Sequence, residues 1–263
     1  MRGTLAIAGK ELRIYFTTPL AYVMLSMFTF VGSWIFLWRV GEFTAQYHQA
    51  MNALRPDIVA QMNLTDWVVT PLVVWLGILL FFIVPFLTMR LVAEERSKDT
   101  FELLMTTPIR PIAIVMGKYL AALGLLLIAL FLTLLYPLLL SIFGSGDEGA
   151  VEWPTVWSGY LGLSLMGAGL MAAGLFVSTL TRSQAVAALV TLVFALLMSI
   201  VTFKAPELSG TAREVFLYLS AGRHLENFAS GRLSLASVSY FASYVVLGLF
   251  LTHRSLEGQR WAA

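Results

Sequence analysis

The stretch WVVTPLVVWLGILLFFIVPFLTM, residues 67–89, contains 23 residues without a single charge. Asp66 precedes it and Arg90 follows it. About 20 apolar residues in a helix are enough to cross the hydrocarbon core of a bilayer. Because lipid offers no hydrogen-bond partner to an open backbone, such a segment must cross as a helix. The stretch therefore predicts an all-α integral membrane protein.

The composition of the whole chain favours the same class. Its 263 residues are 59% hydrophobic and 12% charged, with a mean hydropathy of +0.82, whereas a soluble domain is about 25% charged. The net charge of +2 is too small to indicate a nucleic-acid partner. The absence of cysteine excludes disulfides and cysteine–metal sites. We expect no cleavable signal peptide, because the first 18 residues are mixed polar and basic and the apolar segment after them is too long.

Five further charge-free windows predict five more spanning helices. The six predicted spans are residues 19–38, 67–89, 119–143, 157–180, 183–203 and 233–252. Pro85 and Pro137 lie inside spans two and three and are expected to kink them. The stretches between spans reach only about 30 residues, too few for an independent domain. Residues 1–263 are thus predicted to form a single transmembrane domain.

The distribution of Lys and Arg predicts the orientation. Eleven of the 17 lie in the terminal segments, in the loop between spans two and three, or between spans four and five. Cytoplasmic loops carry the excess of basic residues. We therefore expect both termini and residues 91–111 in the cytoplasm. Residues 204–232 fit this least, since they hold four of the six outer bases.

The charges concentrate in LVAEERSKDTFELLMTTPIRP, residues 91–111. Asp99, followed three residues later by Glu102, partly matches a capping box at the start of a helix. Pro108 disfavours helix at the residue before it. The pattern predicts a helix of about two turns over residues 100–106.

The apolar face of this short helix would consist of Phe101, Leu104 and Met105. A helix of two turns is not stable alone, so this face must be covered. The membrane surface, the ends of the spans of this chain or a cytoplasmic partner could each cover it. Because the anionic inner leaflet repels acids and the loop carries four of them, a protein partner is favoured over lipid.

Two further segments predict helices at the membrane surface. In residues 1–18, one helical face holds the apolar positions Leu5, Ala8, Leu12, Tyr15 and Phe16. The basic Arg2, Lys10 and Arg13 lie largely opposite, although Ile7 and Ile14 interrupt that polar face, and the segment is predicted to be interfacial. Residues 204–232 are amphipathic and too short to cross, with an apolar cluster at Val215, Phe216 and Leu219. They predict a re-entrant or interfacial segment on the outer face, or else an ordinary ordered loop.

The predicted spans contain no Asp, Glu, Lys or Arg. Ion-coupled transporters and charged-ring channels depend on such residues, so a self-powered transporter is disfavoured. The chain also lacks a phosphate-binding loop, because Gly117-Lys118 is followed by Tyr119 and Ile112 stands where the first glycine belongs. Energy for transport would have to come from another protein.

Enzyme and metal-binding functions are disfavoured too. The three histidines, His48, His224 and His253, lie outside the spans or at an end, and neither Ser164 nor Ser199 has a base to activate it. His48 and Met51 stand three residues apart, but methionine at such a spacing is more often packing than a metal ligand.

Span four is rich in small residues. Ser164, Ala168 and Ala172, spaced by four, would let another helix approach closely. Packing within this chain is favoured over a dimer contact.

Residues 93–140 resemble the permeases of type-2 ATP-binding cassette (ABC) exporters, in particular gliding-motility-type and nitrous-oxide-reductase-maturation-type permeases. The matching motifs are Glu94-Glu95-Arg96, Thr100-Phe101-Glu102-Leu103-Leu104, Thr106-Thr107-Pro108 and Gly117-Lys118. The N-terminal KELRIYFTTPLAYV, residues 10–23, is similar to the family's entry into its first span.

The resemblance implies a function. The loop at 91–111 would hold a coupling helix that docks into a separate cytoplasmic ATPase, residues 1–18 would form a connecting helix, and 204–232 would form short re-entrant helices. The ATPase-coupling residues would be Glu94, Glu95, Asp99, Thr100, Phe101, Glu102, Leu103, Leu104 and Met105.

The resemblance also implies a location in the bacterial inner membrane, and it implies the partners. Two permeases, alike or different, would pair with two ATPases, which bind ATP and Mg²⁺, and an accessory protein would stand on the periplasmic side. This chain would itself hold no cofactor, metal or catalytic residue. The alternative function is a membrane anchor or assembly factor that recruits a cytoplasmic protein without transport.

Overall fold

The computed structural model describes residues 2–59, 62–100, 110–144, 151–204 and 210–262. Within these ranges the chain forms helices and turns, and no strand. The helices are α1 (Arg2–Thr17), α2 (Pro19–Asn52), α3 (Pro56–Val59), the π-helical turn η1 (Thr65–Val69), α4 (Thr70–Thr88), α5 (Ala93–Ser97), α7 (Pro111–Thr133), α8 (Leu135–Phe143), α9 (Trp153–Leu180), α10 (Gln184–Lys204), α11 (Gly210–Leu219), α12 (Ala221–Ala229) and α13 (Leu235–Ala262).

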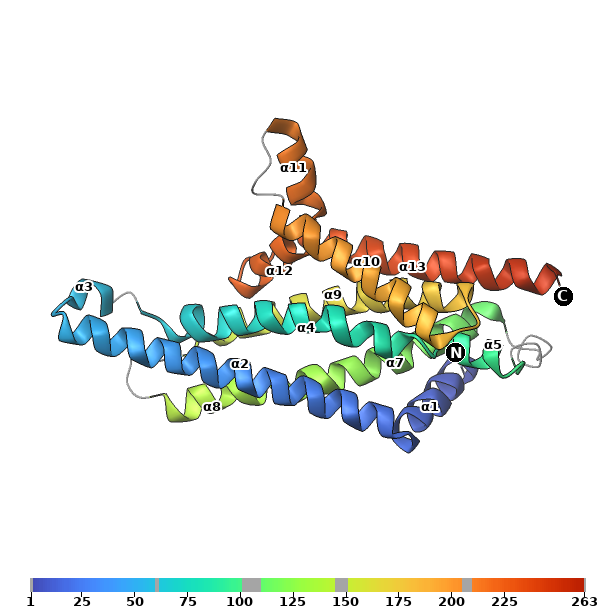
Figure 1. Cartoon of the computed structure of the whole chain (residues 1–263), viewed down its shortest axis with the longest axis horizontal. Helices are drawn as coiled ribbons and strands as arrows, with labels where there is room; N and C mark the ends of the chain where they lie inside the picture. Colours follow the sequence, from blue (N-terminus) through green and yellow to red (C-terminus); the bar gives the residue numbers. More distant parts are fainter. Residues whose placement is uncertain (1, 60–61, 101–109, 145–150, 205–209, 263) are drawn as a thin grey trace.

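The long helices run side by side, and both chain ends lie at one end of the bundle, next to α5 (Figure 1). We call this the terminal end, and the opposite end, which holds α3, the far end. Figure 1 also shows α11 projecting away from the bundle. The terminal end therefore gathers α1, α5 and the C-terminus of α13.

Five helical stretches in the described ranges are long and apolar enough to cross a membrane. They are Pro19–Asn52, Thr65–Ser97, Pro111–Phe143, Trp153–Leu180 and Leu235–Gly258. They confirm a helical, multi-pass membrane protein. The predicted fifth span corresponds to α10, whose described apolar part, Gln184–Ser199, is shorter than these. A sixth crossing stays a prediction.

The helix that contains the first span extends beyond the predicted residues 19–38. It was expected to end at Trp38, but α2 continues through Arg39 to Asn52. Its 34 residues span about 51 Å, against a hydrocarbon core of about 30 Å. Arg39 pairs with Glu42 one turn later and donates to the carbonyl of Trp67, which lies 2.7 Å away. The part of α2 beyond the span is therefore tied to η1 at the far end.

The third span begins earlier than predicted, since α7 starts at Pro111 rather than at Tyr119. Lys118 thus lies inside this helix rather than before it. The helix is interrupted at Leu134, between α7 and α8. Pro137 has no N–H to offer the carbonyl of Thr133, which explains the break at this point.

Close packing around α9 forms the centre of the bundle. A Cβ atom built at Gly162 would lie 2.5 Å from Phe228 on α12, and one built at Gly248 on α13 would lie 2.7 Å from Ala172. Ala168 and Ala172 are buried. The small residues of α9 therefore serve packing within this chain, as predicted.

The amphipathic segment at 204–232 contains α11 and α12, so it is not an irregular loop throughout. α12 buries Leu225 and Phe228 against α4 and α9. Its His224 stacks on Tyr240 at 4.2 Å between ring centroids and contacts the carbonyl of Tyr218 through Nε2. Burial lowers the pKa of His224, so its neutral form holds α12 against α13. The predicted apolar cluster on α11, by contrast, is exposed.

Candidate functional site

The predicted coupling loop begins at the terminal end, where α4 ends at Thr88 and α5 starts at Ala93. α5 lies beside the C-terminus of α9 and close to the chain termini (Figure 1). Residues 101–109, with the predicted apolar face of Phe101, Leu104 and Met105 and with Glu102 and Leu103, lie outside the described residues. Residues 90–100, which lead into the loop and which we call its stem, are described.

A serine from a distant helix caps the start of the stem. The Ser178 hydroxyl on α9 accepts hydrogen bonds from the backbone N–H of Val92, at 3.1 Å, and of Ala93, at 3.0 Å. It also donates to the carbonyl of Met89 at 3.1 Å. The first N–H groups of a helix lack partners within it, and the residue before α5 is Val92, whose side chain cannot cap. Ser178 therefore supplies from α9 the cap that the local sequence lacks.

Two arginines fasten the stem further. Arg96 donates to the carbonyl of Thr179 near the end of α9. Arg90 donates to the Thr18 hydroxyl at 3.2 Å, and its guanidinium lies 5.0 Å from the ring centroid of Tyr15. The stem is thus attached both to α9 and to the junction of α1 with α2.

Asp99 closes α5 rather than opening the next helix. It has a φ of +54°, the left-handed conformation typical of the residue just after a helix. The Thr100 N–H bonds the Glu95 carbonyl at 3.0 Å, which completes this type of helix end. A residue that caps the start of a helix is instead extended. The N-cap interpretation of Asp99 was therefore wrong, because the charged residues before it form a helix of their own.

Glu94 and Glu95, adjacent in the sequence, point to different surroundings. Glu94 lies near solvent and pairs with Lys98 at 2.7 Å and with Arg90 at 3.7 Å. Surface ion pairs of this kind contribute about 0–1 kcal/mol. Glu95 turns inward, and its Oε1 lies 2.8 Å from Nζ of Lys118 on α7.

Lys118 also binds a second carboxylate, that of Glu11 on α1, whose Oε1 lies 2.9 Å from the same Nζ. The Lys118 side chain is only 3% exposed. Sequence reasoning missed both Glu11 and Lys118 as site residues. The available signal was Glu11 itself, a lone acid at the spacing of Ala8 and Tyr15 on an otherwise apolar helical face.

α1 packs on α7 through a face that differs from the predicted one. Of the predicted apolar face, Ala8 and Tyr15 are buried in the protein, whereas Leu5 is 68% exposed. The contact instead uses Ile7, which meets Gly117 so closely that a Cβ on the glycine would lie 2.7 Å from the Cβ of Ile7. The side of α1 that meets α7 is therefore the side that fits the glycine, and the interfacial position of the helix stays a prediction.

Tyr15 joins α1 to the end of α4. Its hydroxyl donates to the Leu87 carbonyl at 2.7 Å, and burial raises the pKa of this phenol above its usual range. The phenol therefore keeps its proton and remains a donor. Together with Arg90 stacked on its ring, it holds the first helix against the root of the stem.

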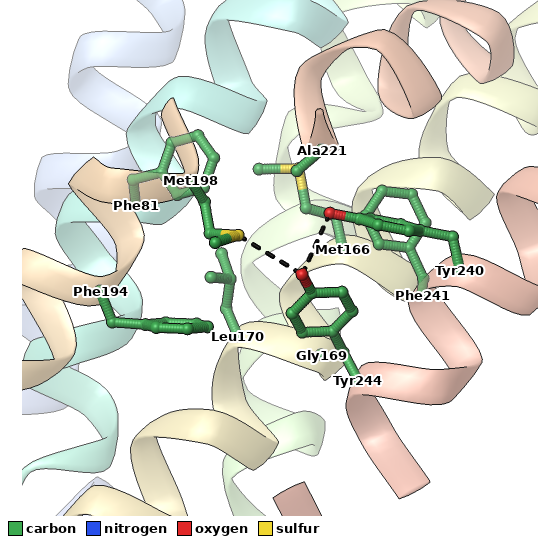
Figure 2. Close-up of a pocket in the computed structure, with 10 residues that line it drawn as sticks. All are labelled: Phe81, Met166, Gly169, Leu170, Phe194, Met198, Ala221, Tyr240, Phe241 and Tyr244. Atoms are coloured by element: carbon green, nitrogen blue, oxygen red, sulfur yellow. Dashed lines mark hydrogen bonds between the residues drawn. The ribbon is translucent and has the colours of Figure 1, made fainter. Parts of the chain in front are cut away.

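A small pocket lies elsewhere, between α4, α9, α10, α12 and α13 (Figure 2). Its lining residues are Phe81, Met166, Gly169, Leu170, Phe194, Met198, Ala221, Tyr240, Phe241 and Tyr244. The Tyr240 hydroxyl donates to the Leu219 carbonyl at 2.7 Å, and the Tyr244 hydroxyl contacts Met198 sulfur at 3.5 Å. Its polar atoms are thus bonded within the protein, and the lining offers no catalytic arrangement.

Comparison with protein families identifies the class of molecule. Residues 40–222 match the family described as ABC-2 family transporter protein. The match covers more than half of the chain and includes the stem, α7, α9 and α10. The chain belongs to the ABC-2 transporter family. Two helices lie outside the matched residues, α1 before them and α13 after them.

Members of the ABC-2 family are membrane components of ABC transporters, and they typically work with a separate cytoplasmic ABC ATPase. Membership confirms the resemblance to type-2 ABC permeases and makes this chain a membrane component of a transporter, a class that is generally not catalytic itself. The finer resemblance to gliding-motility-type and nitrous-oxide-reductase-maturation-type permeases stays a prediction. A comparison with curated proteins found no match.

Proposed function

We propose that this ABC-2 protein is the permease subunit of an exporter that is driven by ATP hydrolysed in a separate cytoplasmic ATPase. The ATPase would dock on the loop whose stem is residues 90–100. The observation that carries the proposal is the attachment of this stem to α9, α1 and α7. A loop so attached passes an applied force to three helices, whereas a merely solvated loop needs no such contacts.

The proposed assembly has two permeases, identical or homologous, and two ATPases. ATP and Mg²⁺ would bind in the ATPase pair, and this chain would hold neither. ATP binding would close the pair and move the coupling loop, which would tilt the spans and change the side to which the pathway opens. An accessory protein on the periplasmic side and membrane lipids complete the expected partners.

Reconstitution with an ABC ATPase encoded beside its gene tests this function. The complex of permease and ATPase, purified into lipid nanodiscs, is expected to hydrolyse ATP faster than the ATPase alone. Vanadate, which arrests ABC ATPases after hydrolysis, should abolish the difference. Failure of the two proteins to co-purify would contradict the proposal.

The alternative, a membrane anchor or assembly factor, predicts a different result from the same preparation. The two proteins would co-purify, but the ATPase would turn over ATP at one rate with and without the permease. A permease-dependent increase in turnover therefore separates transport from recruitment.

We further propose six crossings in the bacterial inner membrane, with α10 as the fifth and the terminal end in the cytoplasm. The absence of native cysteine makes this simple to test, because any introduced cysteine is unique. In intact cells, a membrane-impermeant maleimide should label Gln46→Cys, near the far end of α2, and leave Ser97→Cys on α5 unlabelled. Both positions are exposed. Labelling of Ser97→Cys alone would mean the reverse orientation.

A further inference from the structure

The ion pairs of Lys118 join three separate elements. Its ammonium binds Glu11 on α1 and Glu95 on the stem, at 2.9 and 2.8 Å, from its own place on α7. We call these three residues the charged triad. Its members are far apart in the sequence and converge only in the folded chain.

Stability alone does not account for the charged triad. Removing an ammonium and two carboxylates from water is costly, and a well-packed apolar replacement of a buried ion pair is often as stable or more so. What a buried ion pair can provide is one fixed arrangement of the elements that carry its charges. The charged triad thus fixes the position of α1 and of the stem relative to α7.

The link to the stem depends on Lys118. The second carboxylate oxygen of Glu95, Oε2, is buried and has no hydrogen-bond partner in the described part of the chain. The bond from Lys118 to Oε1 is therefore the hydrogen bond that orients this carboxylate. Glu95 is 19% exposed and Lys118 3%, so the charged triad runs from the edge of the stem into the bundle.

Packing beside the charged triad reinforces it. Gly117 lets Ile7 and the Thr4 carbonyl approach α7, with the latter 3.0 Å from where a Cβ would lie. α1 is thus held to α7 by a close backbone approach and, one residue later on α7, by an ion pair. An element held at two such points follows the movement of its neighbour.

The geometry points to the charged triad as the mechanical link of the coupling loop, with Lys118 as its positioning residue. When the loop moves, Lys118 makes α1 and α7 move with the stem as one body. This inference rests on the proposed function for the source of the movement. It extends that function by naming the residues through which the movement would enter the bundle.

Two substitutions each cut one arm of the charged triad. Glu95→Met removes the bond between Lys118 and the stem, and the remaining Lys118–Glu11 pair has no net charge. Glu11→Met removes the bond between Lys118 and α1, and the remaining Lys118–Glu95 pair has no net charge. Both should therefore fold. Replacing Lys118 would leave two buried carboxylates without a cation and is avoided. Glu257→Met is the matched control, because it removes a carboxylate at the terminal end that pairs only within its own helix, α13, with His253 and Arg254.

Spin labels on introduced cysteines measure the link. Labels at Lys10 on α1 and Ser97 on α5, both exposed, report the distance between α1 and the stem. A second pair, at Ser97 and Gln46, reports movement of the stem relative to the far end. Each labelled chain is diluted with unlabelled chain in nanodiscs, and distances are measured by pulsed electron resonance, first alone and then with the ATPase and ATP–vanadate.

In the wild type and in Glu257→Met, the Lys10–Ser97 distance should be narrowly distributed and insensitive to nucleotide, while the Ser97–Gln46 distance shifts. In Glu95→Met and in Glu11→Met, the Lys10–Ser97 distribution should broaden even without the ATPase. Stimulation of ATP turnover should fall at least about fivefold in Glu95→Met, the lower end of typical coupling between sites. The melting temperature and co-purification of both variants should match those of Glu257→Met, since a purely structural role of the charged triad would alter them.

Two results would overturn the inference in different ways. A Lys10–Ser97 distribution as narrow in both variants as in the wild type would show that the charged triad does not hold these elements together. A wild-type Ser97–Gln46 distance that ignores nucleotide would instead contradict the proposed function, and with it the movement that the charged triad is inferred to transmit.

Discussion

Phe101→Asp is expected to uncouple the ATPase from the permease, or to detach it, while leaving the membrane bundle folded. The predicted helix over residues 100–106 presents Phe101, Leu104 and Met105 on one face. If that face docks into the ATPase, a carboxylate in its centre is buried without a partner. Truncation of a central interface residue costs about 2 kcal/mol or more, which is about thirtyfold in affinity. Leu104→Asp should have the same effect, since it lies one turn away on the same face.

The measurement is co-purification with the ATPase and permease-dependent ATP turnover, beside the melting temperature of the permease alone. Thr106→Asp is the matched control, because the predicted helix would direct Thr106 away from the apolar face and the substitution adds the same charge. The control should bind and stimulate as the wild type does. Normal co-purification and normal turnover in both aspartate variants would refute docking through this face and would favour its contact with lipid or with the bundle.

The spans could be predicted from the sequence because they rest on one local property, the absence of charge. The same property misplaced two helix boundaries. α2 continues for 14 residues beyond Trp38, where the chain is polar but still helical, and hydropathy carries no signal for such an extension. α7 begins at Pro111 and includes Lys118, which a charge-free window excludes by construction. Burying Lys118 required two carboxylates that no local pattern connects to it.

The site shows the same limit at the scale of single residues. Glu94 and Glu95 were predicted together as coupling residues, and neighbouring side chains on a helix point about 100° apart. Which of the two turns inward is decided by how α5 is attached. That attachment comes from Ser178 and Arg96, through contacts that cross more than 80 positions of the chain. A five-residue helix has no periodicity from which this could be predicted.

Two glycines of α7, Gly117 and Gly124, face α1. Substitution of the first is expected to give the second large effect, a loss of stability. A Cβ at Gly117 would lie 2.7 Å from the Ile7 Cβ and 3.0 Å from the Thr4 carbonyl, neither of which is the end of a flexible side chain. A Cβ at Gly124 would meet only the methyl groups of Leu12, at 3.6 Å or more, an ordinary contact. Gly117→Ala should therefore force α1 away from α7, while Gly124→Ala should be accommodated.

The two substitutions should differ in their effect on the stability of the fold. Overpacking costs about 1–3 kcal/mol, so Gly117→Ala is expected to destabilise the fold and to lower ATP turnover in the complex, because displaced α1 takes Glu11 from Lys118. Alanine is favoured over glycine in a helix by about 0.5–1 kcal/mol, so Gly124→Ala should be neutral or stabilising. Thermal unfolding of both variants in detergent measures the change in stability, and the Lys10–Ser97 distance measures the displacement of α1. Equal melting temperatures and an unchanged distance would mean that α1 is not seated on Gly117.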